Sequence, residues 1–126
     1  MRYLIDTHVA LWVLMGEPIS DTAKKILDDV TAEVYVSIAS AWEIAIKVGA
    51  GKLKYAGGVR AFLDDVKMNE FKLLEIKESH IELLEGLEYH HRDPFDRLLI
   101  AAVIADGMTM LTADENIHKY NIPFIW

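Results

Sequence analysis

The fold class of the chain follows from its opening stretch, MRYLIDTHVALWVLM (residues 1–15). Residues 2–5 form a short apolar run typical of a buried β-strand, and this run stops at Asp6. Residues 9–15 form a second apolar run that is closed by Gly16, which predicts a short helix. A strand followed at once by a helix is the usual start of a parallel α/β unit, so we expect an α/β fold.

The same alternation continues along the chain. Further strands are predicted over residues 33–38, 72–76, 108–111 and 123–125, and further helices over 21–30, 40–48, 59–68, 79–87 and 94–105, with a helical turn near Glu115. Parallel strands need crossover connections, which place helices on both faces of the sheet. We therefore expect a mainly parallel central sheet in one domain spanning residues 1–126.

The composition excludes several classes of site. Because the chain has no cysteine, disulfide bonds, thiolate zinc sites and thiol nucleophiles are excluded. The start of the chain lacks the features of a signal peptide, and no apolar run is long enough to span a bilayer. We therefore expect a cytoplasmic protein with no membrane partner.

Charge gives a mixed indication about nucleic acid. The net charge of −7 disfavours binding to a polyanion at long range. Residues 47–60 contain no acid, however, and they carry the four members of a possible RNA-binding patch: Lys47, Lys52, Lys54 and Arg60. Tyr55 lies among them and is a candidate for base stacking. The alternative is a solvated helix end and loop, because lysines near a helix C-terminus interact favourably with its dipole.

Four acidic residues each follow a short apolar run, and they are the candidates for a catalytic metal site: Asp6, Glu43, Asp96 and Asp114. The carboxyl ends of parallel strands meet at one edge of the sheet, near a topological switch point. Asp6, Glu43 and Asp114 follow predicted strands and are expected there. Asp96 lies at the start of the long apolar helix instead. Because the connection over residues 87–92 is unassigned, the sequence does not decide at which edge of the sheet this helix begins.

Carboxylates gathered at one point repel each other unless a cation holds them. Hard oxygen ligands select Mg²⁺ or Mn²⁺, and such ions bind phosphate oxygens and lower the pKa of a water. Phosphodiester hydrolysis is therefore the expected chemistry. Three hydroxyl residues close to the acids are candidates to support the site: Thr7, Ser40 and Thr112.

Each acid also has a structural explanation. Ser40 and Glu43 match a capping box at the start of a helix. Asp93 and Asp96 fit the N-cap and N3 positions of another helix. Asp6 and Asp114 could cap helices too. If the acids only cap helices, the chain is a non-catalytic α/β binding module.

The remaining candidates point to structure. The five histidines show no zinc-like spacing, and His90 and His91 precede a helix cap, where they are expected to be solvated. Trp12 and Trp42 are expected to pack in the core. The apolar residues 9–15 lie near a second helix with further apolar positions, which is more apolar surface than a short helix pair needs to cover a sheet edge.

Four motifs, taken together, resemble those of PIN-domain nucleases, in particular the VapC-like toxins of type II toxin–antitoxin modules. They are LIDTH (residues 4–8), SAWEIAIK (40–47), HRDPFDRLLIA (91–101) and LTAD (111–114). The resemblance implies a three-layer α/β/α fold and a divalent metal held by the four acids, with the start of the Asp96 helix at the site. It also implies endoribonuclease activity and inhibition by a small antitoxin.

Two further expectations follow. With the resemblance, the apolar surface of the early helices predicts a homodimer that also binds an antitoxin peptide.

A phosphoacceptor signalling domain is the other single-domain α/β alternative. It needs adjacent acids after the first strand, and Asp6 stands alone.

Overall fold

Strands and helices alternate along the whole chain in a computed structural model that describes residues 1–126. The strands are β1 (Arg2–Ile5), β2 (Glu33–Ser37), β3 (Lys72–Leu74), β4 (Thr109–Leu111) and β5 (Phe124–Ile125). The helices are α1 (Thr7–Leu14), α2 (Asp21–Asp28), α3 (Ile38–Gly49), α4 (Gly58–Met68), α5 (Glu78–Glu85), α6 (Pro94–Asp106) and α7 (Glu115–His118). The predicted type of every element is confirmed, and the ends shift by a few residues.

All five strands are parallel, in the order β3-β2-β1-β4-β5. The chain builds outwards from β1 in one direction to β3, then returns to the other side of β1 for β4 and β5. This reversal makes the boundary between β1 and β4 the topological switch point of the sheet. Ile5, the last residue of β1, is in register with Val36 of β2 and Leu111 of β4, so these three strands end side by side.

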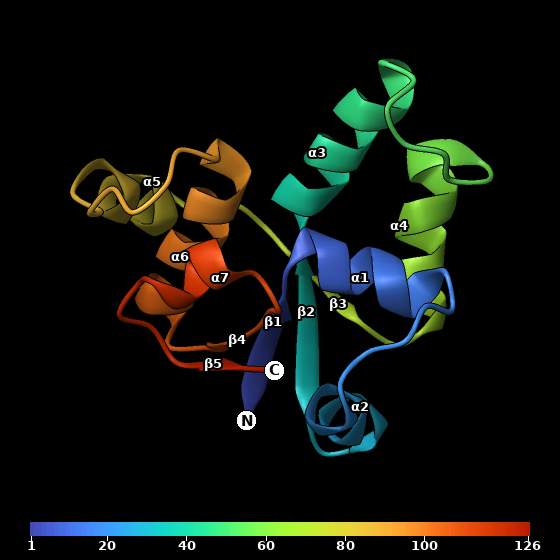
Figure 1. Ribbon diagram of the computed structural model, residues 1–126, viewed down its shortest axis with the longest axis horizontal. Helices are drawn as coiled ribbons and strands as arrows, with labels where there is room; N and C mark the ends of the chain where they lie inside the picture. The colour runs from blue at the N-terminus through green and yellow to red at the C-terminus, as the bar shows by residue number, and fades with distance from the viewer.

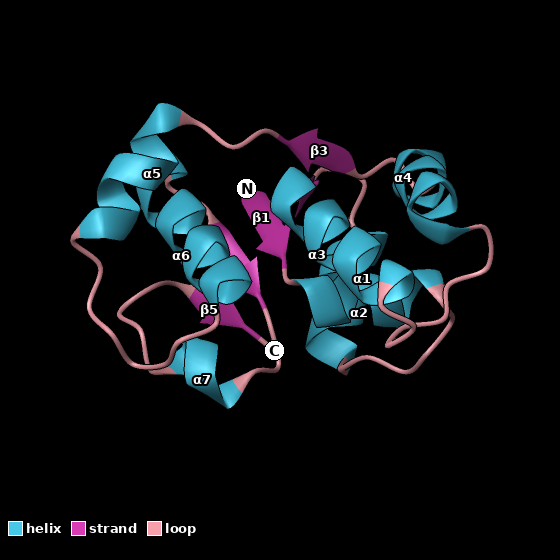
Figure 2. Cartoon of the chain, turned by 90° about the horizontal axis from the view of Figure 1, so that it is seen from above, coloured by secondary structure: helices cyan, strands magenta, loops and turns pink.

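Helices cover both faces of the sheet (Figures 1 and 2). Right-handed crossovers place α1 to α4 on one face, and the reversal at β1 places α5, α6 and α7 on the other. Successive residues of β1 alternate between the two cores, since Leu4 packs under α6 while Tyr3 and Ile5 pack under the first four helices. The predicted three-layer α/β/α fold is confirmed.

One predicted cap is wrong. α3 begins at Ile38, two residues earlier than predicted, and its N-cap is Ser37, whose hydroxyl accepts a hydrogen bond from Ala39 N at 3.0 Å. Ser40 therefore lies within the first turn and forms no capping box with Glu43. Two serines three residues apart both suit an N-cap. Ser37 takes this position because β2 pairs with β3 as far as Ser37 and leads directly into the helix.

The tryptophans differ from one another. Trp12 is half-buried and packs against Trp126, with ring centroids 5.7 Å apart. Trp42 is 57% exposed, so its prediction as a core residue is wrong. The apolar side of α3 is set by Ala41 and Ile44, which are buried, and Trp42 lies between them on the outer side of the helix. None of the helices has both the length and the apolar character needed to cross a lipid bilayer.

Candidate active site

Asp6 lies at the switch point, directly after β1, and is only 2% exposed. Its Oδ1 accepts a hydrogen bond from Val9 N at 2.8 Å, and its Oδ2 accepts one from the hydroxyl of Thr112. Burial raises the pKa of Asp6 above its ordinary value and outweighs these hydrogen bonds, which lower it. The ionised form is therefore disfavoured in this setting, and a nearby positive charge would stabilise it.

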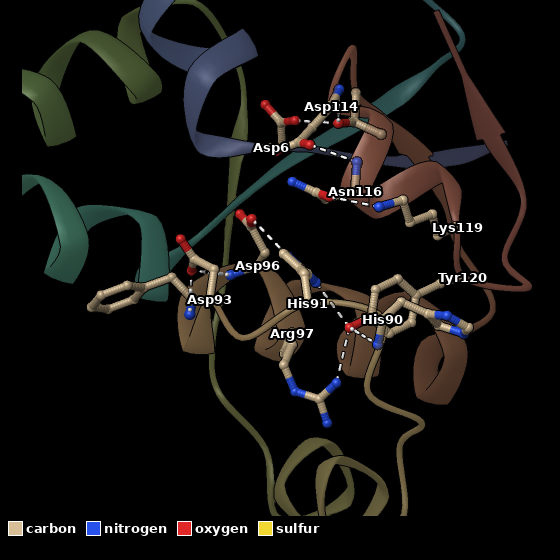
Figure 3. Close-up of polar contacts among 12 residues, drawn as sticks. Asp6, His90, His91, Asp93, Asp96, Arg97, Asp114, Asn116, Lys119 and Tyr120 are labelled. Carbon is tan, nitrogen blue, oxygen red and sulfur yellow. Dashed lines mark hydrogen bonds and ion pairs between the residues drawn. The ribbon is translucent and has the colours of Figure 1, made fainter.

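Asp114 lies beside Asp6, just beyond β4 (Figure 3). The same threonine orders both residues, because Thr112 Oγ1 also accepts a hydrogen bond from Asp114 N at 3.0 Å. Asp6 and Asp114 line a common pocket of about 250 Å³ together with His8 and Trp12. The structure thus brings two of the predicted acids to one opening at the end of the sheet.

Glu43 lies in the second turn of α3 and is 4% exposed. Its Oε2 accepts from Lys47 Nζ at 2.6 Å, while its Oε1 is buried and has no hydrogen-bond partner. One turn earlier on the same side of the helix, Ser40 Oγ accepts a hydrogen bond from the hydroxyl of Thr7 at 2.8 Å. Since Thr7 adjoins Asp6, this bond fixes the start of α3 beside the end of β1.

Asp96 lies in the first turn of α6, and the structure places this turn at the same edge of the sheet. Its pKa is raised to about 6, mainly by burial and against the hydrogen bond from His91, with the negative charges of Asp93 and Asp114 raising it further. The start of α6 packs against the start of α3, which carries Glu43, and this packing decides the edge that the sequence left open.

Two aromatic rings join the starts of α3 and α6. Trp42 and Phe95 pack edge to face with ring centroids 4.9 Å apart. Each ring adjoins a candidate acid in the sequence, Trp42 beside Glu43 and Phe95 beside Asp96. The pair therefore holds these two helix starts together at the rim of the site.

Capping accounts for some of the acids but not for all of them. Asp6 caps α1 through Val9 N, and Asp114 caps α7 through Asn116 N at 2.8 Å. Asp93 caps α6, as predicted, by accepting from both Phe95 N and Asp96 N. Neither Glu43 nor Asp96 caps a helix with its carboxylate. Each has one oxygen paired, Glu43 with Lys47 and Asp96 with His91, and the buried Oε1 of Glu43 is left without a partner.

The family model of the PIN domain matches residues 3–123, which is nearly the whole chain. The chain belongs to the PIN domain family. Members of this family are generally nucleases that depend on divalent metal ions. Comparison with curated protein sequences finds no match.

Solved structures with a similar fold include the following three. VapBC2 from Rickettsia felis, bound to a DNA fragment from their promoter, is 15% identical with a TM-score of 0.74, covering 99% of this chain and 98% of that one. FitAcB from Neisseria gonorrhoeae is 16% identical with a TM-score of 0.67 and covers 98% and 96%. DNA-bound VapBC from Salmonella typhimurium is 12% identical with a TM-score of 0.72 and covers 99% and 97%. At these identities the likeness establishes the fold.

The donor set of this PIN domain suits a hard cation, because it consists of carboxylate oxygens. Glu43 Oε1, buried without a partner, is an oxygen that a cation would satisfy. No group of three acidic or histidine side chains lies close enough together to hold a single ion. Three-fold ligation therefore requires side chains at this edge to turn towards one another.

The basic patch of the PIN domain divides into two pairs. Lys47 is paired with Glu43, and Arg60 is paired with Asp64 at 3.0 Å. Lys52 and Lys54 are exposed and form no ion pair. The ring proposed for stacking is also engaged: the hydroxyl of Tyr55 donates to Asp65, and its ring packs on Phe62. Tyr55 is therefore not a free stacking ring.

Sequence reasoning missed three residues behind Asp96: His91, Arg97 and Tyr120. The prediction that His91 is solvated is wrong, since its side chain is 11% exposed and hydrogen-bonded at both ring nitrogens. Tyr120, which lies 29 residues further along the chain, covers it. The one local signal was Arg97, a cation directly before the apolar run of α6, which needs polar partners when it is buried.

Proposed function

We propose that this PIN domain is a cytoplasmic, Mg²⁺- or Mn²⁺-dependent endoribonuclease and the toxin of a toxin–antitoxin pair. The observation that carries the proposal is the unpartnered, buried Oε1 of Glu43 at the edge where Asp6 and Asp114 share a pocket. A buried carboxylate oxygen with no donor is costly unless a cation binds it. Family membership supports the nuclease class, and the resemblance in the four motifs supports RNA as substrate and an antitoxin as partner.

The four acids take the role of metal ligands in this proposal: Asp6, Glu43, Asp96 and Asp114. A bound divalent ion supplies positive charge to the scissile phosphate and lowers the pKa of a water. The protein residues position the ligands. Thr112 holds Asp6 and Asp114 through one hydroxyl, while Thr7 and Ser40 join the strand end to α3, which carries Glu43.

Exposed aromatic surface at the rim supports a single-stranded substrate. Trp42 is 57% exposed and, through Phe95, reaches both helix starts that carry acids. Base stacking on such rings tolerates any sequence, and it requires bases that are not already stacked in a duplex. The unpaired Lys52 and Lys54 lie beyond the C-terminal end of the same α3 helix and are candidates for phosphate contacts.

The competing hypothesis is a binding module whose acids only cap helices. It draws support from Asp6 and Asp114, which do act as caps. Glu43 caps nothing, and although Lys47 pairs with its Oε2, the binding module gives no reason for the buried Oε1 that has no partner. Glu43 is therefore the residue at which the two hypotheses differ most.

Cleavage of single-stranded RNA by the purified protein tests the proposal. We expect cleavage with Mg²⁺ or Mn²⁺, none with excess EDTA, and a loss of about a hundredfold or more in Glu43→Gln, comparable to losing a major electrostatic contributor. Glu33→Gln is the matched control, since Glu33 is an exposed glutamate at the start of β2, paired only with Lys72. Cleavage by Glu43→Gln at the parent rate would favour the binding module. Sequencing the 5′ ends of fragments formed in cells would identify the RNA.

We propose that the chain forms a homodimer, and that it also binds an antitoxin peptide through its early helices. The structure reduces the available surface, since residues 11–14 are half-buried and pack on the core under α1 to α4. Met15 and Val30 remain exposed, at 49% and 98%. Each is an exposed apolar side chain, Met15 directly after α1 and Val30 shortly after α2, where a partner can bind.

A further inference from the structure

Arg97 is a buried cation without an acidic partner. It is 4% exposed, and its guanidinium donates to the carbonyl oxygens of Glu88 at 2.7 Å and Leu87 at 3.0 Å and to the hydroxyl of Tyr120 at 2.9 Å. An arginine cannot lose its proton in a protein, so all three bonds have a fixed direction, from Arg97 outwards. Arg97 therefore ties the loop after α5 to the segment after α7.

The direction of the next bond follows from the hydroxyl of Tyr120. Its oxygen already accepts from Arg97, and its single proton has an acceptor in Nδ1 of His91, 2.9 Å away. Nδ1 of His91 must then be unprotonated, which leaves the proton of the neutral ring on Nε2. Nε2 lies 3.0 Å from Oδ2 of Asp96 and donates to it. Figure 3 shows this sequence of contacts from Arg97 to Asp96.

We propose that His91 is a positioning residue for the metal ligand Asp96, fixed as its Nε2–H tautomer by the hydrogen bonds from Arg97 through Tyr120. The proposal rests on the proposed function insofar as Asp96 is taken to bind metal. His91 occupies Oδ2 and holds the carboxylate plane, which leaves Oδ1 of Asp96, with no hydrogen bond in the structure, for a cation. Residues that hydrogen-bond to a metal ligand commonly set its orientation and its affinity for the ion.

The residues of this hydrogen-bonded chain are largely shielded from water, which favours a fixed arrangement. Tyr120 is 4% exposed, and the side chain of His91 is 11% exposed. The contacts join three segments: the first turns of α6, the loop over residues 87–91, and the residues after α7. No single segment can move without breaking one of these hydrogen bonds.

Nitrogen-15 NMR of histidine-labelled, metal-free protein tests the tautomer, with the His91 signals assigned from their loss in His91→Gln. We expect an unprotonated Nδ1 and a protonated Nε2 in the parent protein. Tyr120→Phe, which keeps the ring and removes the hydroxyl, should give a mixture of tautomers. A protonated Nδ1 in the parent, or an unchanged tautomer in Tyr120→Phe, would overturn the proposed chain of bonds.

Mn²⁺ affinity, measured by calorimetry on the full chain, tests the positioning role. We expect His91→Ala to bind Mn²⁺ about tenfold or more weakly than the parent, the usual effect of losing a hydrogen bond to a ligand. His91→Gln should restore most of the affinity, because a glutamine amide nitrogen reaches the position of Nε2. His91→Asn, whose amide reaches only the position of Nδ1, should resemble His91→Ala.

His90→Ala is the matched control, since the His90 imidazole pairs with the exposed Glu88, packs edge to face with the ring of Tyr120 and makes no hydrogen bond to Asp96. Parent-like affinity in His91→Ala, or no rescue by His91→Gln at equal melting temperature, would overturn the positioning role while leaving the proposed function intact. A parent protein that binds no Mn²⁺ would overturn the proposed function, and the positioning role with it. The tautomer is decided by the metal-free measurement in either case.

Discussion

At the level of single residues, Asp93 and Asp96 lie three positions apart in the same helix start and do different work. Asp93 caps α6 with two hydrogen bonds, whereas Asp96 is half-buried and hydrogen-bonded to His91. We predict that Asp96→Asn lowers RNA cleavage by about two orders of magnitude or more, the scale of losing a major electrostatic contributor. Asp93→Asn should keep most of the activity, because asparagine is also a good cap.

Stability provides a second measurement on the same pair. Burial raises the pKa of Asp96 to about 6, so at neutral pH its ionised form destabilises the metal-free fold. Asp96→Asn should therefore melt at a higher temperature than the parent without metal, while Asp93→Ala should lose about 1 kcal/mol of unfolding free energy. If Asp96→Asn cleaves RNA at the parent rate in Mg²⁺, Asp96 is not part of the site.

A second residue-level prediction concerns pH and lies at the far end of α6. Burial would raise the pKa of Asp106, but hydrogen bonds from His80 and Lys77 outweigh it, and the pKa is lowered. A carboxylate with a lowered pKa in the folded state stabilises the protein above its unfolded pKa of about 3.9, and this contribution is lost as pH falls through its folded pKa.

We therefore predict that Asp106→Asn melts below the parent at neutral pH, and that the difference shrinks as pH falls below about 4, the ordinary range of this pKa. Thermal melts of both proteins over that range measure it. Asp64→Asn is the control, since Asp64 makes only an exposed ion pair with Arg60. A difference between Asp106→Asn and parent that does not depend on pH would contradict the prediction.

At the level of elements, the segment between α3 and α4 carries the lysines that are expected to bind RNA phosphates. Lys47 and Arg60 already have acidic partners, which leaves Lys52 and Lys54 as the free cations. We predict that the double variant Lys52→Gln/Lys54→Gln binds RNA more weakly and with a salt dependence flatter by about two phosphate contacts, since each contact adds roughly one unit of slope. Its Mn²⁺ affinity should not change.

The control is Lys24→Gln/Lys25→Gln on α2, which changes the net charge equally. Figure 1 shows α2 near the start of β2, away from the strand ends that carry the acids. A filter-binding titration at several salt concentrations separates the two variants. If RNA binding by both variants has the same dependence on salt, the loop is an ordinary solvated surface.

At the level of the whole molecule, we predict a homodimer that binds an antitoxin peptide. Light scattering at micromolar concentration should give twice the monomer mass, and expression with the neighbouring gene should yield a small co-purifying protein. Met15→Asp together with Val30→Asp adds charge at two exposed apolar positions and should weaken one association or both. A monomer with no co-purifying partner would contradict the prediction.

Much of this PIN domain is determined by its sequence. Element types follow from periodicity within a few residues, and the strand–helix alternation requires a parallel sheet, because parallel neighbours need crossovers. Chain order then brings Asp6 and Asp114 to the same sheet edge. Asp93 was predictable as a cap for the same reason, since a cap bonds backbone groups only two or three residues away.

The tertiary structure alone decided which side chains meet across distant segments. Ser37 replaced Ser40 as the cap of α3 because β2 ends there, and Ser40 was left to bond Thr7, 33 positions away. His91 is half-buried because Tyr120 packs over it, 29 residues further along the chain. Such contacts depend on how the helices pack on the sheet, and local propensity and residue spacing do not determine that packing.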